Sequence, residues 1–132
     1  MLCEITQGLG HRFEQYNAEW IRQYFRVQGY GDIDLIVNRR EADLMHEVNE
    51  KGSEFEIDIM CFEPFLICEA TSYLKEDEVE KVDKFVKIGQ VMRKRYMKKP
   101  EMFFFALAVE PRIKEEVKMI CAKNNIKLVT QW

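Results

Sequence analysis

The sequence predicts an α/β fold in which a mixed β-sheet core is flanked by helices. Two segments, 65–70 and 103–109, are almost wholly apolar, which is typical of strands covered on both faces in the middle of a sheet. Three other segments carry apolar residues at helical spacing, so their apolar faces can provide that cover. The expected order of elements along the chain is α-β-β-β-α-β-α-β.

The first predicted helix spans residues 5–25, and glycines within 29–31 end it. Residues 32–39 then alternate apolar and polar side chains, as in a strand covered mainly on one side. Residues 41–53 are polar and have no firm period. We therefore expect one strand followed by a long connection.

A β-hairpin is predicted next, because residues 55–62 alternate again and a turn at 63–64 leads into the apolar strand 65–70. Alternation along the first strand places four side chains on one face: Phe55, Ile57, Ile59 and Cys61. Glu56, Asp58 and Met60 are expected on the opposite face.

The second half of the chain alternates helices with strands. The predicted elements are a helix over 79–96, a strand over 103–109, a helix over 113–121 and a strand over 126–130. Acids at 76–78 suit the start of the first of these helices. Pro111 suits the first turn of the second, and asparagines at 124–125 can end it.

The composition suits a single domain, residues 1–132, because 47% of the chain is hydrophobic. A formal net charge of −3 provides no overall basic field, which argues weakly against nucleic-acid binding. The four cysteines lack metal-ligand spacing, so we expect reduced, mostly buried thiols. No apolar stretch reaches about 18 residues and no export signal is visible, so we expect a cytoplasmic protein without a membrane span.

Two acids lie in predicted strands of the sheet, where burying a charged carboxylate is energetically unfavourable. Asp58 lies in the middle of a predicted strand, and Glu69 closes the next, otherwise apolar strand. Burying an uncompensated carboxylate costs several kcal/mol, so each needs a partner. Acids on neighbouring strands can share a divalent cation such as Mg²⁺, which prefers oxygen ligands. Pairing with lysines or local backbone explains the same spacing equally well.

The hairpin resembles that of the PD-(D/E)XK nuclease superfamily, in which an aspartate precedes an apolar strand ending in Glu-x-Lys. This chain reads Glu-Ile-Asp-Ile over 56–59 and Phe-Leu-Ile-Cys-Glu-Ala-Thr over 65–71. Asp58 matches the first acid of the family and Glu69 the second. Thr71 stands where the family has its lysine, so this cation is missing from the motif.

The first helix is similar to that of Holliday-junction-resolvase-like members, because residues 10–14 form a Gly-x-x-x-Glu motif. The resemblance gives Glu14 a metal-facing role, with Glu19 as a second candidate. The order of elements also fits a poorly characterised, mainly archaeal branch of the superfamily. The resemblance therefore implies a restriction-endonuclease-like fold and a Mg²⁺- or Mn²⁺-dependent DNA endonuclease, with Glu14, Asp58 and Glu69 as metal ligands.

Several basic residues are candidates for the missing cation and for DNA contact. Lysines from other elements sometimes replace the family lysine, which makes Lys75, Lys81 and Lys84 candidates, although each is more simply a solvated charge. Five basic residues cluster at the end of the second helix: Arg93, Lys94, Arg95, Lys98 and Lys99. They suit contact with a DNA backbone, and we predict Arg93, Lys94 and Lys98 as the contacts. Cations at a helix C-terminus are also common for dipole reasons alone. Gln90 and Tyr96 weakly resemble site residues of some nuclease branches.

Other polar residues give weaker signals. Asp32 and Asp34 are predicted surface acids of an edge strand, because no Glu-x-Lys-like strand follows them at hairpin distance. His11 and His46 lack partners at the spacing of a zinc site or a nucleophile, which disfavours hydrolase triads.

Three hypotheses follow from the sequence. The first is an active endonuclease on double-stranded or branched DNA, acting as a homodimer through the aromatic first helix. The second is a catalytically inactive nuclease fold that binds DNA or protein, which Thr71 and the acidic net charge favour. The third is an unrelated domain whose three acids are dispersed in space.

Overall fold

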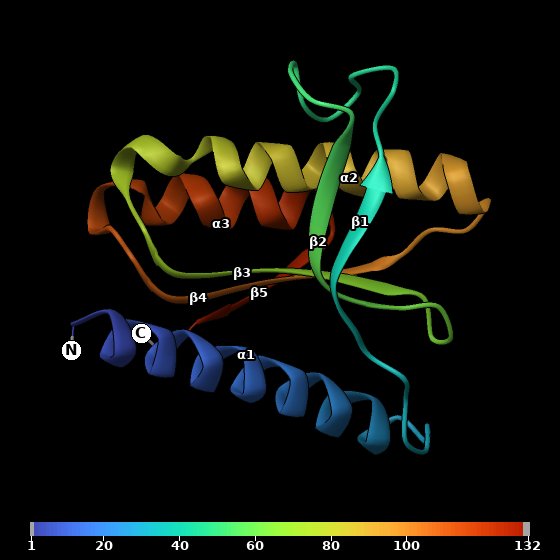
Figure 1. Ribbon diagram of the computed structural model, residues 1–132, viewed down its shortest axis with the longest axis horizontal. Coiled ribbons are helices and arrows are strands. Elements are labelled where there is room, and N and C mark those ends of the chain that lie inside the picture. The colour runs from blue at the N-terminus through green and yellow to red at the C-terminus, as the bar shows by residue number, and fades with distance from the viewer. Residues whose placement is uncertain (1, 131–132) are drawn as a thin grey trace.

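The computed structural model describes residues 2–130, with side chains from residue 13 onward. In this part of the chain, five strands form one mixed sheet in the order β1-β2-β3-β4-β5. Helix α1 (Leu2–Val27) covers one face of the sheet, and α2 (Glu80–Tyr96) and α3 (Lys114–Lys123) cover the other (Figure 1). The predicted α/β class, the mixed sheet and the order of elements are confirmed.

The sheet changes from antiparallel to parallel at its centre. Its strands are β1 (Ile36–Ala42), β2 (Glu54–Cys61), β3 (Leu66–Leu74), β4 (Glu101–Val109) and β5 (Ile126–Thr130). Pairing is antiparallel between β1 and β2 and between β2 and β3, whereas β3–β4 and β4–β5 are parallel. The two apolar segments form β3 and β4 inside the sheet, as predicted.

An apolar core lies on each face of the sheet. Phe103 and Phe105 of β4 pack with the α1 side chains, whereas Phe104 packs against Phe85 of α2 at a centroid distance of 6.0 Å. Each buried aromatic ring contributes about 1.5–3 kcal/mol through the area removed from water. The predicted free, buried thiols are observed for Cys61, Cys68 and Cys121, and the side chain of Cys3 lies outside the described part.

The first strand begins later than predicted, at Ile36 rather than at residue 32. The preceding residues are held by α1 instead: Asp32 pairs with Arg26 at 3.2 Å, and Ile33 is buried in the α1-side core. Asp32 and Asp34 are exposed, but they precede the edge strand and do not lie on it.

The third strand is longer than predicted and continues to Leu74. Pairing with β4 extends past the apolar part, through Thr71↔Ala106 and Tyr73↔Ala108. Because β4 supplies backbone partners, this polar stretch stays extended. Glu69 therefore lies inside β3, and the prediction that it ends the strand is wrong.

The β1–β2 hairpin crosses α2 and is attached to its C-terminal turn (Figure 1). Glu41 of β1 is only 6% exposed, and it accepts a hydrogen bond from the Tyr96 hydroxyl at 2.8 Å. Arg39 and Arg95 lie 3.1 and 3.4 Å from the Glu41 carboxylate, and Arg95 also donates to the carbonyl of Ala42 at 2.8 Å. Residue 41, expected in a polar connection, thus anchors the hairpin to the helix.

This anchor predicts a stability effect. We expect Glu41→Gln to lower the free energy of unfolding by about 1–2 kcal/mol, because Tyr96 and the two arginines lose a buried carboxylate partner. Glu54→Gln is the control, since its ion pair with Arg40 is solvent-exposed and such pairs contribute below about 1 kcal/mol. Urea denaturation measures both, and equal losses would contradict the assignment.

Candidate functional site

Strands β2 and β3 separate beside the two predicted acids. Their ladder runs from Cys61↔Leu66 to Ile59↔Cys68. Beyond this rung β2 continues paired with β1, and β3 continues paired with β4. Asp58 and Glu69 are the residues immediately beyond the last rung, so they lie where the sheet opens.

Asp58 compensates for the end of the ladder. Its Oδ2 accepts a hydrogen bond from the backbone N–H of Ala70 at 2.9 Å, in place of a carbonyl from β2. A buried N–H without a partner costs about 1–3 kcal/mol, so this contact stabilises the opening. It also fixes the carboxylate against the edge of β3.

The faces of β2 reverse around Asp58. Phe55, Ile57 and Met60 belong to the core under α2, whereas Ile59 and Cys61 belong to the core under α1. The predicted common face of Phe55, Ile57, Ile59 and Cys61 is therefore wrong.

The physical reason for the reversal is that β2 turns away from β3 here, so strict alternation breaks. A matching irregularity lies on β1. Asn38, between the paired residues Val37 and Arg39, has a positive φ of 53°.

A pocket of about 240 Å³ contains both acids. Asp58, Glu69 and Thr71 line it from the strands, and Lys81 and Lys84 line it from α2. The dispersal of acids expected from the third hypothesis is not observed for Asp58 and Glu69. Lys75 is not among the residues that line this pocket.

The two carboxyl groups influence each other strongly. Burial and the adjacent Asp58 carboxylate together raise the pKa of Glu69 to about 8, although the charges of Lys84 and Lys81 oppose the rise. Burial also raises the pKa of Asp58, with smaller contributions from Glu56 and Glu14. Two carboxyl groups in contact bind a proton or a cation between them.

The oxygen donors of this pair fit a hard divalent cation. Mg²⁺ is commonly held by one or two carboxylates and completes its shell with waters and substrate phosphates. Within residues 13–130, no group of three acidic, histidine or cysteine side chains is close enough to hold a metal alone. Asp58 and Glu69 would therefore share the coordination with water or substrate.

Glu14 approaches Asp58 from the opposite face of the sheet. It projects from α1 and lines a second pocket of about 210 Å³, which contains Asp58, Asn17 and Ser72. Asp58 thus belongs to both pockets, with Glu69 on the α2 side and Glu14 on the α1 side. Glu19, the second candidate on this helix, lines a different groove.

Among the three predicted DNA contacts, Arg93 points away from the acid pocket. Arg93 lines a third pocket of about 230 Å³ with Lys99 and Lys123. Each helical residue turns by about 100°, so Arg93 lies roughly on the opposite side of α2 from Lys84. Lys94 pairs with Glu47 at 3.7 Å, and Lys98 is exposed just beyond the helix.

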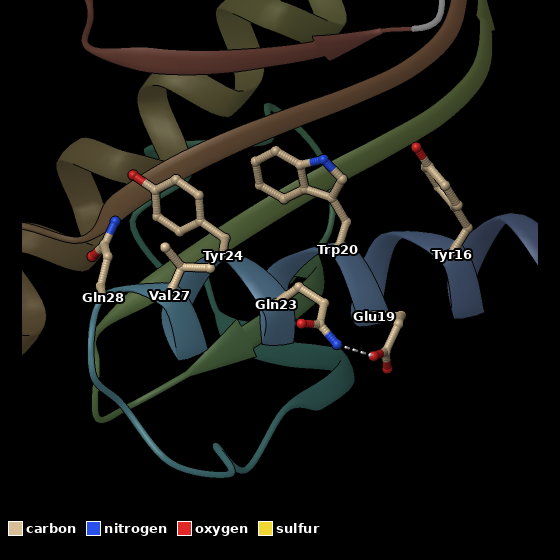
Figure 2. Close-up of a pocket in the computed structure, with 7 residues that line it drawn as sticks. All are labelled: Tyr16, Glu19, Trp20, Gln23, Tyr24, Val27 and Gln28. Carbon is tan, nitrogen blue, oxygen red and sulfur yellow. Dashed lines mark hydrogen bonds between the residues drawn. The ribbon is translucent and has the colours of Figure 1, made fainter.

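A groove of about 480 Å³ runs along α1 (Figure 2). Tyr16, Trp20 and Tyr24 stand in a row along it, and the Trp20 and Tyr24 rings stack at 5.4 Å. Glu19 is the only acid among the described residues that line it, so the groove lacks the paired charges needed for phosphate chemistry. The homodimer predicted through this aromatic helix stays a prediction.

Comparisons of the chain with protein-family models, with curated proteins and with solved structures found no match. None of the helices in the described part is long and apolar enough to span a membrane. Function is therefore inferred from the geometry and chemistry of the acid pocket itself.

The raised pKa of Glu69 predicts a pH dependence of stability. Its folded-state pKa of about 8 exceeds the ordinary value of 4.5, so the folded protein binds this proton more tightly than the unfolded chain. Without divalent cations, the free energy of unfolding should fall by a few kcal/mol as the pH rises from about 4.5 to about 8.

Glu69→Gln should flatten this dependence, whereas the exposed control Glu116→Gln should retain it. Chemical denaturation across this pH range measures the effect. An unchanged slope in Glu69→Gln would show that the pair does not share a proton.

Proposed function

We propose that this protein is a divalent-metal-dependent DNA endonuclease of the PD-(D/E)XK superfamily, with a restriction-endonuclease-like fold. The observation that carries the proposal is the contact between Asp58 and Glu69 in a pocket where β2 and β3 separate. The motif resemblance and the order of elements support it. Hydrolysis of a phosphodiester bond is the chemistry that such a pair suits best.

Asp58 and Glu69 would hold Mg²⁺ or Mn²⁺, with Glu14 adding negative charge from the other side of Asp58. When bound, the metal supplies an activated water and stabilises charge on the phosphate. The Ala70 N–H orients Asp58, and α2 forms the opposite wall with its lysines. The site thereby orients a phosphate between the carboxylate pair and a positively charged wall.

Metal-dependent cleavage is the direct test. We expect Mn²⁺ to bind the wild type and to support nicking of supercoiled or branched DNA. Asp58→Asn and Glu69→Gln should each reduce the rate by about a hundredfold or more, since each removes a ligand that orients the metal. Asp34→Asn is the control, because Asp34 is exposed and outside the pocket.

Lys84 is our candidate for the cation that Thr71 cannot supply. Both Lys81 and Lys84 line the pocket, and the charges of both oppose the pKa rise of Glu69. Lys81 is paired with Glu78. Among the described residues Lys84 has no ion pair, so its ammonium group is the one available to a bound phosphate.

The role of Lys84 predicts a rescue. Lys84→Met should slow cleavage by about tenfold or more, and adding Thr71→Lys should restore part of the rate by returning a cation to the motif position. Lys87→Met, an exposed change on the same helix, should leave the rate unchanged. Equal rates for Lys84→Met and the wild type would exclude this assignment.

DNA contact by Arg93, Lys94 and Lys98 is part of the same proposal. Because Arg93 faces away from the acid pocket, it would contact a backbone phosphate distant from the cleaved bond. Each such contact contributes affinity without sequence information and weakens as salt rises.

The second candidate function is an inactive nuclease fold that binds DNA or protein. Two observations favour it: Thr71 occupies the lysine position, and the exposed aromatic groove of α1 offers an interaction surface. Metal binding that depends on Asp58 and Glu69, without any cleavage, would select this function over the first.

A further inference from the structure

Asn17 of α1 is a buried amide without a partner. Its side chain is 0% exposed, and neither Nδ2 nor Oδ1 has a hydrogen-bond partner in the described part of the chain. Its helix neighbours Ala18, Ile21 and Phe25 form an apolar interface with the sheet. Nearly all buried polar atoms in proteins are hydrogen-bonded to protein or to ordered water, so this amide requires an explanation.

The pocket beside Asn17 explains how its amide can be hydrogen-bonded. Asn17 is one of the residues that line the pocket of about 210 Å³, together with Glu14, Asp58 and Ser72. Glu14 and Asn17 are three residues apart on α1, so they face the same side of the helix. A pocket of this volume, lined in part by polar side chains, has room for several waters, each able to make two to four hydrogen bonds. The unpaired amide therefore belongs to a residue at the wall of a pocket that water can fill.

We propose that Asn17 is a positioning residue that holds an ordered water between α1, β2 and β3, and that this water fixes the Asp58 carboxylate. The amide N–H donates a hydrogen bond to the water oxygen, and the water O–H donates a hydrogen bond to the carboxylate. Asp58 is then held by the Ala70 N–H on β3 and by the Asn17 water on the α1 side. The role of this water in metal binding rests on the proposed function, whereas its presence does not.

The water is observed directly by NMR on the full chain labelled with ¹⁵N. We expect rotating-frame Overhauser cross-peaks of direct sign between the Asn17 side-chain amide protons and water. Ser72→Ala should keep these cross-peaks, which excludes relay through the nearby hydroxyl. A dry amide, without any cross-peak to water, would overturn the proposal.

Positioning of Asp58 is reported by the Ala70 amide, which donates to it. In Asn17→Leu, an apolar change of similar volume, hydrogen exchange at Ala70 should accelerate by about tenfold or more, while the paired Cys68 amide keeps its protection. Ile21→Val is the matched control, because Ile21 is buried on the same helix but does not line the pocket. Unchanged exchange at Ala70 in folded Asn17→Leu would overturn the positioning role.

Mn²⁺ affinity, measured by calorimetry, connects the water to the metal site. We expect Asn17→Leu to weaken Mn²⁺ binding by about tenfold, as is typical for residues that orient a ligand, and Ile21→Val to change it by less than about twofold. Equal affinity in Asn17→Leu and wild type would overturn the connection. Absence of Mn²⁺ binding by wild type would instead contradict the proposed function, and the two NMR measurements would still decide the role of Asn17.

Discussion

The separation of β2 from β3 is the constraint on which the rest of this structure depends. One strand stays with β4 in the buried centre, while the other follows β1 across α2 (Figure 1). Backbone groups at the fork lose their strand partner and need another, because buried peptide groups are almost always hydrogen-bonded. A carboxylate at the fork meets that need and at the same time lies against the acid of the neighbouring strand. One side chain, Asp58, thus replaces the missing backbone partner and also forms half of the carboxylate pair.

Asp58 has different surroundings on each face of the sheet. Toward α2 it meets Glu69 and the lysines, which can balance its charge. Toward α1 it shares a pocket with Glu14 and Asn17, which supply no positive charge. The acid therefore lies between one pocket with lysines in its lining and another pocket without them.

Periodicity predicted the number, type and order of the elements because each alternation or helical stripe is a local property of the chain. Asp58 and Glu69 were also predictable, since acids are conspicuous inside apolar strands. The end of β3 could not be predicted from the sequence, because residues 71–74 stay extended through pairing with a distant strand, β4. The reversal of the two faces of β2 was not predicted for a related reason. The prediction assumed regular alternation along the strand, and this alternation breaks at the fork.

The direction of Arg93 and the environment of Asn17 depend on tertiary contacts that no local pattern reveals. Arg93 belongs to a basic run that reads as one cluster, yet the helix turns it away from the acid pocket. Asn17 occupies a position on the core-facing stripe of α1, where an amide gives no signal until its neighbours are known. Its position three residues after Glu14 was the one available hint.

The contact between Glu41 and the end of α2 has a consequence for how this fold can vary. It fixes the hairpin to the helix below the tip, residues 43–53, and Figure 1 shows the tip projecting beyond α2. Changes in the exposed part of the tip should not move the strands at the fork, because the Glu41 carboxylate is bound to α2 between these two regions. The exposed residues 50–52 can therefore diverge in length and composition while the spacing of the acids stays constant, whereas Asp43 and Val48 of the tip are buried and fix the rest of its shape.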